Sequence, residues 1–507
     1  MAHRAVALIR SLPAGLAAAG VILLTLGTLL AVALRAEVGR GFSPGDWAAI
    51  RFTVAQAAVS ALVSVALAIP VARALARRRF RGRGALVMLL GAPFILPVIV
   101  AVLGLLAVFG RGGLLNDGLA LLGIAPVSIY GAGGVVLAHV FFNLPLAVRL
   151  ILQGWLSIPA ERFRLAAQLN APIWRVLEVP MLARHAPGAV LVVFLICLTS
   201  FAVALTLGGG PKATTVELAI WQAVRFDFDL GRAARLACVQ FALCAVAALV
   251  AWRATPVAGF GRGLDRTVAR WDQSPSDWLW LAAVTVFLVT PLAMVVWRGL
   301  PGLAELSPEI WRAALLSVLV AVAATLLCLG CALALALRGG LAVAVLGALP
   351  LAASGLVMGT GLFLIFFPVV NPVRVALPVT VAVNAIMALP FALRLLAPAV
   401  ADIRADYGRL ATILGLSPGA TLRLVVLPRL RAPLGFAAGL TMALSIGDLG
   451  VVALFATPDQ ETLPLAMYRL MGAYRMEAAA GAALLLLALA LGAFWICDRG
   501  GRRDADA

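Results

Sequence analysis

Cysteine and histidine are the residue types most able to hold a metal ion or to carry redox chemistry, and this chain has few of either, 6 and 3 respectively. Cys328 and Cys331 form a CxxC pair, but their neighbours are Leu, Gly and Ala, which offer no polar surroundings to a metal or a thiolate. His3, His139 and His185 are too far apart in the sequence to suggest ligand spacing. The sequence also lacks a phosphate-binding loop and a nucleophile with a matching base. We therefore expect no metal and no other cofactor, and predict that the protein is not an enzyme.

The polar side chains inside long apolar stretches are the next candidates for chemistry. Asp448 is a carboxylate in such a stretch, and a charge in the middle of a bilayer costs at least about 2.5 kcal/mol, so it should face a cavity or a partner. Two roles fit Asp448. It either lies on a transport path or caps a helix at a break in the span. Asn143 and Asn384, together with Ser445, are further candidates for the path, although hydrogen bonds between helices would explain the asparagines equally well.

Membrane-spanning helices must position these residues. Hydrophobic residues make up 63% of the chain and charged residues 12%, and the mean hydropathy is +1.07. Apolar runs of about 18 residues or more recur, and because they are continuous they favour helices over the alternating strands of a barrel. We predict an all-α integral membrane protein with about twelve transmembrane helices in two tandem six-helix repeats. The expected spans are 13–34, 53–75, 85–109, 131–153, 187–207, 233–252, 278–298, 313–337, 341–368, 376–398, 433–455 and 477–497.

A polar hairpin occurs twice, with its copies about 245 residues apart. The copies lie near residues 155–187 and 400–433, and each reaches a turn, at Asn170 in the first and Gly415 in the second. One such hairpin could be a plain basic loop, but two copies in register indicate a duplicated membrane unit. The predicted parts are a first half, 1–255, a cytoplasmic linker, 256–277, and a second half, 278–507.

The basic residues predict which side of the membrane each loop faces. The net charge is +18, and with the N-terminus inside, most Lys and Arg fall in cytoplasmic ends and loops, both hairpins included. We therefore expect both termini and both hairpins in the cytoplasm. Attraction to anionic lipid headgroups accounts for this charge, so the basic balance does not indicate nucleic-acid binding.

Two matched segments are expected on the opposite side. Gly208, Gly209 and Gly210 form a flexible turn before the amphipathic stretch 215–224, and a second such stretch, 462–471, follows the turn in the other half. Both stretches are too interrupted to span a membrane and are typical of interfacial or re-entrant elements. We predict that the three glycines contribute to a periplasmic gate, with simple connecting loops as the alternative.

The hairpins resemble the EAA loops of type I ABC importer permeases, and four further stretches resemble the fused permeases of thiamine and thiamine pyrophosphate importers. Those stretches are YGAGGVVLAHVFFNLPLAVRLILQ (130–153), LTLGGGPKATTVELAIWQAV (205–224), LSIGDLGVVALF (444–455) and TLPLAMYRLMGAYR (462–475). The resemblance covers nearly the whole chain. It implies a bacterial inner-membrane subunit that works with an ABC ATPase, in two copies, and with a periplasmic thiamine-binding protein.

The resemblance also assigns residues to contact with the ATPase. They are Glu161, Arg164, Leu165, Ala166, Ala167 and Asn170 in the first hairpin, and Asp406, Arg409, Leu410, Ala411 and Gly415 in the second. Arg164 and Arg409 stand where the motif usually has a glutamate. Glu161 and Asp406, three residues earlier on the same helical face, could supply that charge or could pair internally with the two arginines.

Two function classes remain for comparison. An ATP-driven importer permease accounts for the paired hairpins. A secondary transporter can also be built from repeats, but it generally needs more intramembrane carboxylates than this sequence offers. We therefore predict an importer permease for thiamine or its pyrophosphate, with ferric iron as the alternative substrate.

Overall fold

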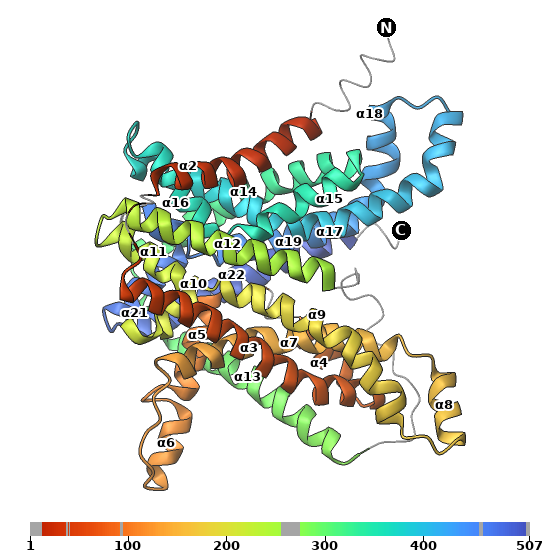
Figure 1. Ribbon diagram of the computed structural model, residues 1–507, viewed down its shortest axis with the longest axis horizontal. Helices are drawn as coiled ribbons and strands as arrows, with labels where there is room; N and C mark the ends of the chain where they lie inside the picture. The colour runs from red at the N-terminus through yellow and green to blue at the C-terminus, as the bar shows by residue number, and fades with distance from the viewer. Residues whose placement is uncertain are drawn as a thin grey trace.

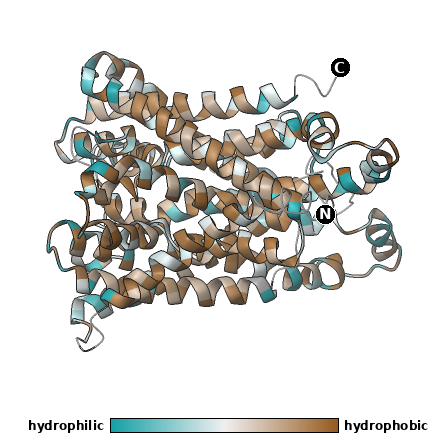
Figure 2. Cartoon of the chain, turned by 90° about the horizontal axis from the view of Figure 1, so that it is seen from above, coloured by the Kyte–Doolittle hydropathy of each residue, from teal (hydrophilic) through white to brown (hydrophobic). Residues whose placement is uncertain are grey.

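The computed structural model describes residues 13–36, 39, 41–91, 95–254, 274–455 and 460–502. These residues form helices and no strands. Eleven of the helices in this part are long and apolar enough to cross a membrane, and Gly355–Phe366 is a shorter apolar helix. The spans run side by side (Figure 1), and hydrophobic residues fill their middle while hydrophilic ones gather toward the two ends (Figure 2). The predicted all-α membrane fold with about twelve helices is therefore confirmed.

We refer to the described residues up to 254 as the first half and those from 274 as the second half. The predicted linker, 256–277, lies largely outside the described residues. The first half consists of the span Pro13–Arg35, which contains η1 (Leu23–Gly27) and α2 (Thr28–Arg35), then α3 (Pro44–Arg77), α4 (Arg83–Leu89), α5 (Val98–Phe109), α6 (Leu114–Leu121), α7 (Ala132–Leu156), α8 (Ala160–Gln168), η3 (Trp174–Glu178), α9 (Val179–Leu198), α10 (Phe201–Leu207), η4 (Pro211–Ala213), α11 (Val216–Arg225) and α12 (Leu230–Ala254). The second half consists of α13 (Ser276–Gly302), η5 (Leu303–Glu305), α14 (Pro308–Arg338), α15 (Leu341–Ala348), η6 (Leu349–Ala352), α16 (Gly355–Phe366), η7 (Pro372–Val375), α17 (Ala376–Ile413), α18 (Pro418–Thr421), η8 (Leu422–Val426), α19 (Leu427–Ile446), α20 (Val452–Phe455), α21 (Leu463–Gly472) and α22 (Met476–Arg502).

The third span of each half is broken, so the single helices predicted over 85–109 and 341–368 are wrong. In the first half, α4 ends at Leu89 and α5 begins only after Pro97. In the second half, Pro350 falls in the 3₁₀ turn η6, and Ser354 then caps α16 by accepting a hydrogen bond from the Val357 N–H at 3.1 Å. Proline lacks the N–H that a helix interior needs, which favours a break in the helix at Pro97 and at Pro350.

The spans predicted over 187–207 and 433–455 begin earlier and are also interrupted. In the first half, α9 ends at Leu198 and α10 starts at Phe201. The last carbonyls of a helix have no partner within it, and here two glutamine side chains supply one. Gln56 of α3 donates to the Cys197 carbonyl at 3.1 Å, and Gln240 of α12 donates to the Leu198 carbonyl at 2.8 Å.

The corresponding break in the second half lies between α19 and α20. It begins at Gly447, and Asp448 Oδ1 accepts a hydrogen bond from the Gly450 N–H at 3.3 Å. The two halves therefore repeat the same interruption but satisfy its polar groups differently.

The first helix of each half packs against the other half. Helix α2 lies on α16, and α13 lies on α5. Glycines at matching positions of α5 and α16 make both crossings close. A Cβ on Gly361 would lie 2.5 Å from the Thr28 carbonyl oxygen, and a Cβ on Gly104 would lie 2.6 Å from the Pro291 carbonyl oxygen. This exchange of helices ties the two halves into one bundle.

Substitution of either crossing glycine tests this exchange. We expect Gly104→Ala and Gly361→Ala each to destabilise the protein by about 1–3 kcal/mol, because the added methyl group meets a backbone carbonyl that cannot move independently. Gly330→Ala in α14 is the control, since a Cβ there has no atom within 4 Å. Thermal unfolding of the purified protein in detergent measures the difference. Equal melting temperatures for all three variants would contradict the close crossings.

Candidate functional site

The two hairpins lie at the same end of the molecule, where Figure 1 labels α8 and α18. They are attached differently. In the first, α7 ends at Leu156 and α8 starts as a separate helix after Pro159. In the second, α17 continues without a break through 38 residues into the hairpin. The residue corresponding to Pro159 in the repeat is Arg404, which can keep the helical hydrogen bond that proline lacks.

The predicted turns are present at Asn170 and Gly415. Both residues have left-handed backbone conformations, with φ of 47° and 63°. In the first turn the Ala171 N–H bonds to the Ala166 carbonyl at 2.9 Å, and in the second the Leu416 N–H bonds to the Ala411 carbonyl at 3.0 Å. This is the Schellman arrangement, which closes the end of a helix and reverses the chain. Asparagine and glycine are the residues that adopt this conformation most readily.

The residues predicted to meet the ATPase divide into an inner and an outer set. Ala166 and Ala411 are buried inside their hairpins, at 4% and 7% exposure. The other residues predicted to meet the ATPase form the outer set and face solvent. Among them, Leu165 and Leu410 are 55% and 51% exposed.

The four charged residues of the set are also exposed. They are Glu161 and Arg164 in the first hairpin and Asp406 and Arg409 in the second. Within the described part of the chain, no ion pair joins the acid to the arginine in either hairpin. These four side chains are therefore available to a partner.

A buried polar cluster anchors the first hairpin to the membrane helices. Glu178 of η3 has no exposed surface, and its Oε1 accepts a hydrogen bond from the Trp155 indole at 3.1 Å. Arg73 Nε lies 2.8 Å from Glu178 Oε2, and the same guanidinium lies over the Trp174 ring at 5.4 Å.

The second hairpin has apolar residues where the first has this cluster. Val400 and Val426 stand at the positions that match Trp155 and Glu178, and both are buried. Sequence reasoning missed the cluster, although Glu178 without an acidic counterpart in the repeat was a visible signal.

The opposite end holds the two short amphipathic helices, α11 and α21, each of ten residues. Their first N–H groups are held in the same way in both halves. The Val216 N–H donates to Thr53 Oγ1 of α3, and the Leu463 N–H donates to Ser317 Oγ of α14, each at 2.8 Å. A helix of ten residues is too short to cross a bilayer. Each of these helices is instead bonded at its start to a membrane-spanning helix, α11 to α3 and α21 to α14.

The three glycines predicted for the gate lead into α11. Gly208 is buried, whereas Gly209 and Gly210 are exposed and have φ of +67° and +124°, which only glycine adopts easily. In the second half the corresponding turn includes residues 456–459, which lie outside the described residues. Glu461 follows it, and Arg469 Nη2 lies 2.6 Å from its carboxylate. Burial raises the pKa of Glu461 despite this partner.

The polar residues predicted for the path make contacts between helices. Asn143 of α7 donates to the His139 carbonyl at 2.9 Å and to Cys197 Sγ of α9 at 3.4 Å. Asn384 of α17 donates to Ser445 Oγ of α19 at 2.9 Å. The structure therefore engages all of these side chains with neighbouring helices.

Asp448 differs from these residues because one of its oxygens lacks a partner. Oδ1 accepts the Gly450 N–H, whereas Oδ2 is buried and has no hydrogen bond within the described structure.

Glu217 of α11 is a buried carboxylate that sequence reasoning missed. Its residue is 2% exposed, and the carboxylate accepts hydrogen bonds from Gln240 at 3.4 Å and from the Ser354 side chain. The sequence placed α11 at the interface, where a charge faces water, and so gave no reason to expect burial.

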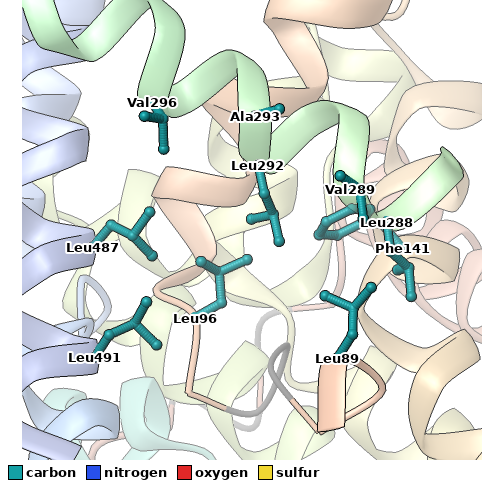
Figure 3. Close-up of a pocket in the computed structure, with 10 residues that line it drawn as sticks. All are labelled: Leu89, Leu96, Phe141, Leu288, Val289, Leu292, Ala293, Val296, Leu487 and Leu491. Atoms are coloured by element: carbon teal, nitrogen blue, oxygen red, sulfur yellow. The ribbon is translucent and has the colours of Figure 1, made fainter. Parts of the chain in front are cut away.

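A cavity of about 300 Å³ lies between α13, α22 and the broken third span of the first half (Figure 3). All ten lining side chains are apolar, with Leu487 and Leu491 of α22 facing Leu292 of α13. An acyl chain suits such a lining better than a polar solute does. Among the described residues, no group of three or more His, Cys, Asp or Glu could hold a metal ion.

Comparison with known proteins gives consistent relatives, although no family model matches the chain. The chain is 38% identical over 520 residues to the thiamine transport system permease protein ThiP of Brucella abortus (strain 2308), covering 97% of this chain and 96% of that protein. It is 39% identical over 515 residues to the protein of the same name from Salmonella typhimurium, covering 96% of each. A match to the molybdenum transport system permease protein ModB of Mycobacterium bovis is 28% identical and covers 48% of this chain and 93% of that protein.

The buried anchor of the first hairpin can be tested by Glu178→Ala. We expect it to destabilise the protein by about 1–3 kcal/mol, because the Trp155 indole loses its acceptor and Arg73 loses a carboxylate at 2.8 Å. Glu178→Gln keeps an acceptor and should lose less. Val426→Ala, at the matching position of the other half, is the control for simple loss of side-chain volume. Hydrogen exchange of the two hairpins resolves the effect, and a change confined to the second hairpin would refute the anchor.

Proposed function

The chain belongs to the thiamine transport permeases of the type I ABC importer family, and on that premise we propose that it is the membrane subunit through which thiamine enters a bacterial cell. The observation that carries this proposal is the pair of exposed hairpins, closed by the same turn at the same end of the molecule. A carrier that works without an ATPase has no use for two such surfaces. None of the relatives reported above is named for ferric iron, so that alternative is not supported.

The proposal assigns a side of the membrane to each end. The hairpin end faces the cytoplasm, with both termini, and two ATPase copies bind the exposed residues of α8 and α17. The end with α11 and α21 faces the periplasm, where a thiamine-binding protein delivers its ligand near the turn Gly208 to Gly210. The excess of basic residues at the hairpin end supports this orientation.

The proposed division of the chain is 1–255, 256–277 and 278–507. The match in which 48% of this chain aligns with 93% of a permease supports it, because one half then corresponds to a nearly complete unit. Each half supplies one hairpin, one short outer helix and one broken third span.

Two mechanical links connect the hairpins to the transport path in this proposal. Helix α17 is continuous from the second hairpin into the membrane, so a push on Leu410 moves the whole helix. The first hairpin acts through Glu178, which holds η3 to α3 and α7. Closure of the ATPases then rocks the halves against each other and opens the outer end. Asp448 is the proposed contact for substrate, while Asn143, Asn384 and Ser445 hold the moving helices together.

Reconstitution tests the function directly. We expect ATP-dependent uptake of labelled thiamine into proteoliposomes only when this chain, its ATPase and its binding protein are all present. ATP hydrolysis stimulated by the binding protein without thiamine uptake would keep the importer and reject the substrate. Uptake by this chain alone would reject the importer itself.

The charges on the hairpins make a second prediction. Glu161→Lys and Asp406→Lys replace attraction to a basic partner by repulsion, so we expect the ATPase to bind at least about fivefold more weakly, equal to about 1 kcal/mol. Asp117→Lys in α6 is the control, because it makes the same charge change on an exposed residue at the opposite end of the molecule from both hairpins (Figure 1). Binding of the purified ATPase to each variant in nanodiscs measures the affinity. Unchanged affinity in the double variant would exclude these acids from the interface.

A further inference from the structure

One face of α11 meets the second half of the protein. Trp221 donates its indole N–H to the carbonyl of Ala453 in α20 at 3.2 Å, which links the two halves directly. Glu217 lies one helical turn earlier, on the same face, because residues four apart stand above each other on a helix. Its carboxylate accepts a hydrogen bond from Ser354, the capping residue of α16 in the second half. Both side chains are therefore part of the contact between halves.

Asp448 lies on the other side of this contact. It precedes α20, and its Oδ2 is buried without a hydrogen-bond partner in the described structure. Asp448 and Phe201, which belongs to α10 of the first half, both lie next to Gly450. A Cβ on Gly450 would be 3.8 Å from Asp448 Oδ1 and 3.8 Å from the Phe201 ring. Phe201 in turn lies 6.0 Å from the Trp221 ring. The two carboxylates thus flank a group of aromatic rings at the same contact.

Neither carboxylate has a basic partner within the described residues. Glu217 bonds only to neutral groups, and Asp448 bonds to backbone N–H groups. Gln240 donates to Glu217, and its own Oε1 is buried without a hydrogen bond in the described structure. A buried carboxylate without a counter-charge is costly, so a purely structural role would be better served by an amide or a hydroxyl.

Resting on the function proposed above, we propose that the contact between α11 and α20 is both the outer gate and, when open, the binding site for a flat aromatic cation. Separation of the two helices breaks the bond from Trp221 to Ala453. The same movement uncovers Glu217 and Asp448, one from each half, beside the faces of Trp221 and Phe201. Carboxylates and aromatic faces both attract a delocalised organic cation, and such a cation supplies the positive charge that the chain does not.

This arrangement is not repeated by the pseudo-symmetry. Pro464 stands in α21 where α11 has Glu217, and no acid of the first half matches Asp448. The contact between α11 and α20 therefore presents one carboxylate from each half. A substrate that carries its charge in one of two linked rings can be held by both, with one ring between the aromatic side chains.

Uptake of two substrates tests the site in proteoliposomes that hold all three components. The first is thiamine, and the second is an uncharged isostere in which thiophene replaces thiazolium, each supplied at a concentration that saturates the binding protein. We expect Glu217→Gln and Asp448→Asn each to slow thiamine uptake at least about tenfold, and to slow uptake of the isostere less than about twofold. Asp117→Asn, an exposed acid of α6 at the same end, should change neither rate.

Each other outcome counts against the site. Equal slowing of both substrates would make the carboxylates structural, and unchanged thiamine uptake would remove them from the path. Glu217→Asp keeps the charge and should retain the preference for the cation; if Glu217→Gln does not yield monodisperse protein, Asp448→Asn and Glu217→Asp decide the question. If the unmodified protein hydrolyses ATP with its partners but imports neither substrate, the proposed function fails. Failure of the site alone looks different, because the unmodified protein then imports thiamine and the variants do not slow thiamine selectively.

Discussion

A bilayer offers no water to backbone N–H and C=O groups, and the structure depends on how this chain satisfies those groups where its helices stop. Four of its spans are interrupted within apolar sequence, and polar side chains bond to backbone groups at three of these breaks. Gln56 and Gln240 take the carbonyls at the end of α9, and Ser354 takes an N–H at the start of α16. Thr53 and Ser317 do the same for the short outer helices. Because most of these partners sit on other helices, the breaks also fix how the helices pack.

Close packing between the halves follows from a second constraint, which is that two helices can approach only where their side chains are small. Gly104 and Gly361 provide this at matching positions, and each accepts the backbone of the first helix of the opposite half. Without water to drive association inside the membrane, such van der Waals contact carries much of the helix–helix attraction. The exchange of first helices means that the halves cannot separate without breaking the close crossings at Gly104 and Gly361, whereas the contact between α11 and α20, which we propose to open, involves neither crossing.

The class of fold could be predicted from hydropathy alone, since runs of apolar residues of membrane length leave helices as the only credible spans. The turns at Asn170 and Gly415 could be predicted as well, because a repeated pattern ends each time in a residue that tolerates left-handed conformation. The break between α9 and α10 could not, because only Thr199 and Ser200 separate two apolar stretches there and neither residue excludes a helix. Glu217 was missed for a different reason. An acid in a short amphipathic stretch indicates an exposed face, whereas here α12 of the same half and α16 of the other half both supply partners to the buried carboxylate.

The two halves share one order of helices, but different residues at matching positions attach their hairpins to the membrane helices in different ways. The first hairpin begins with a separate helix after Pro159 and is held by a buried charge cluster, while the second begins as the end of a continuous helix that enters the membrane. Val400 and Val426 stand where the first hairpin has the polar pair Trp155 and Glu178, and the second hairpin is held instead by apolar packing and by Arg404, which donates to the Leu337 carbonyl of α14. Likewise, neither carboxylate at the contact between α11 and α20 has an acidic counterpart at the matching position of the other half. A single chain permits such divergence, because fusion of two units ensures that each half always meets the other and never a copy of itself.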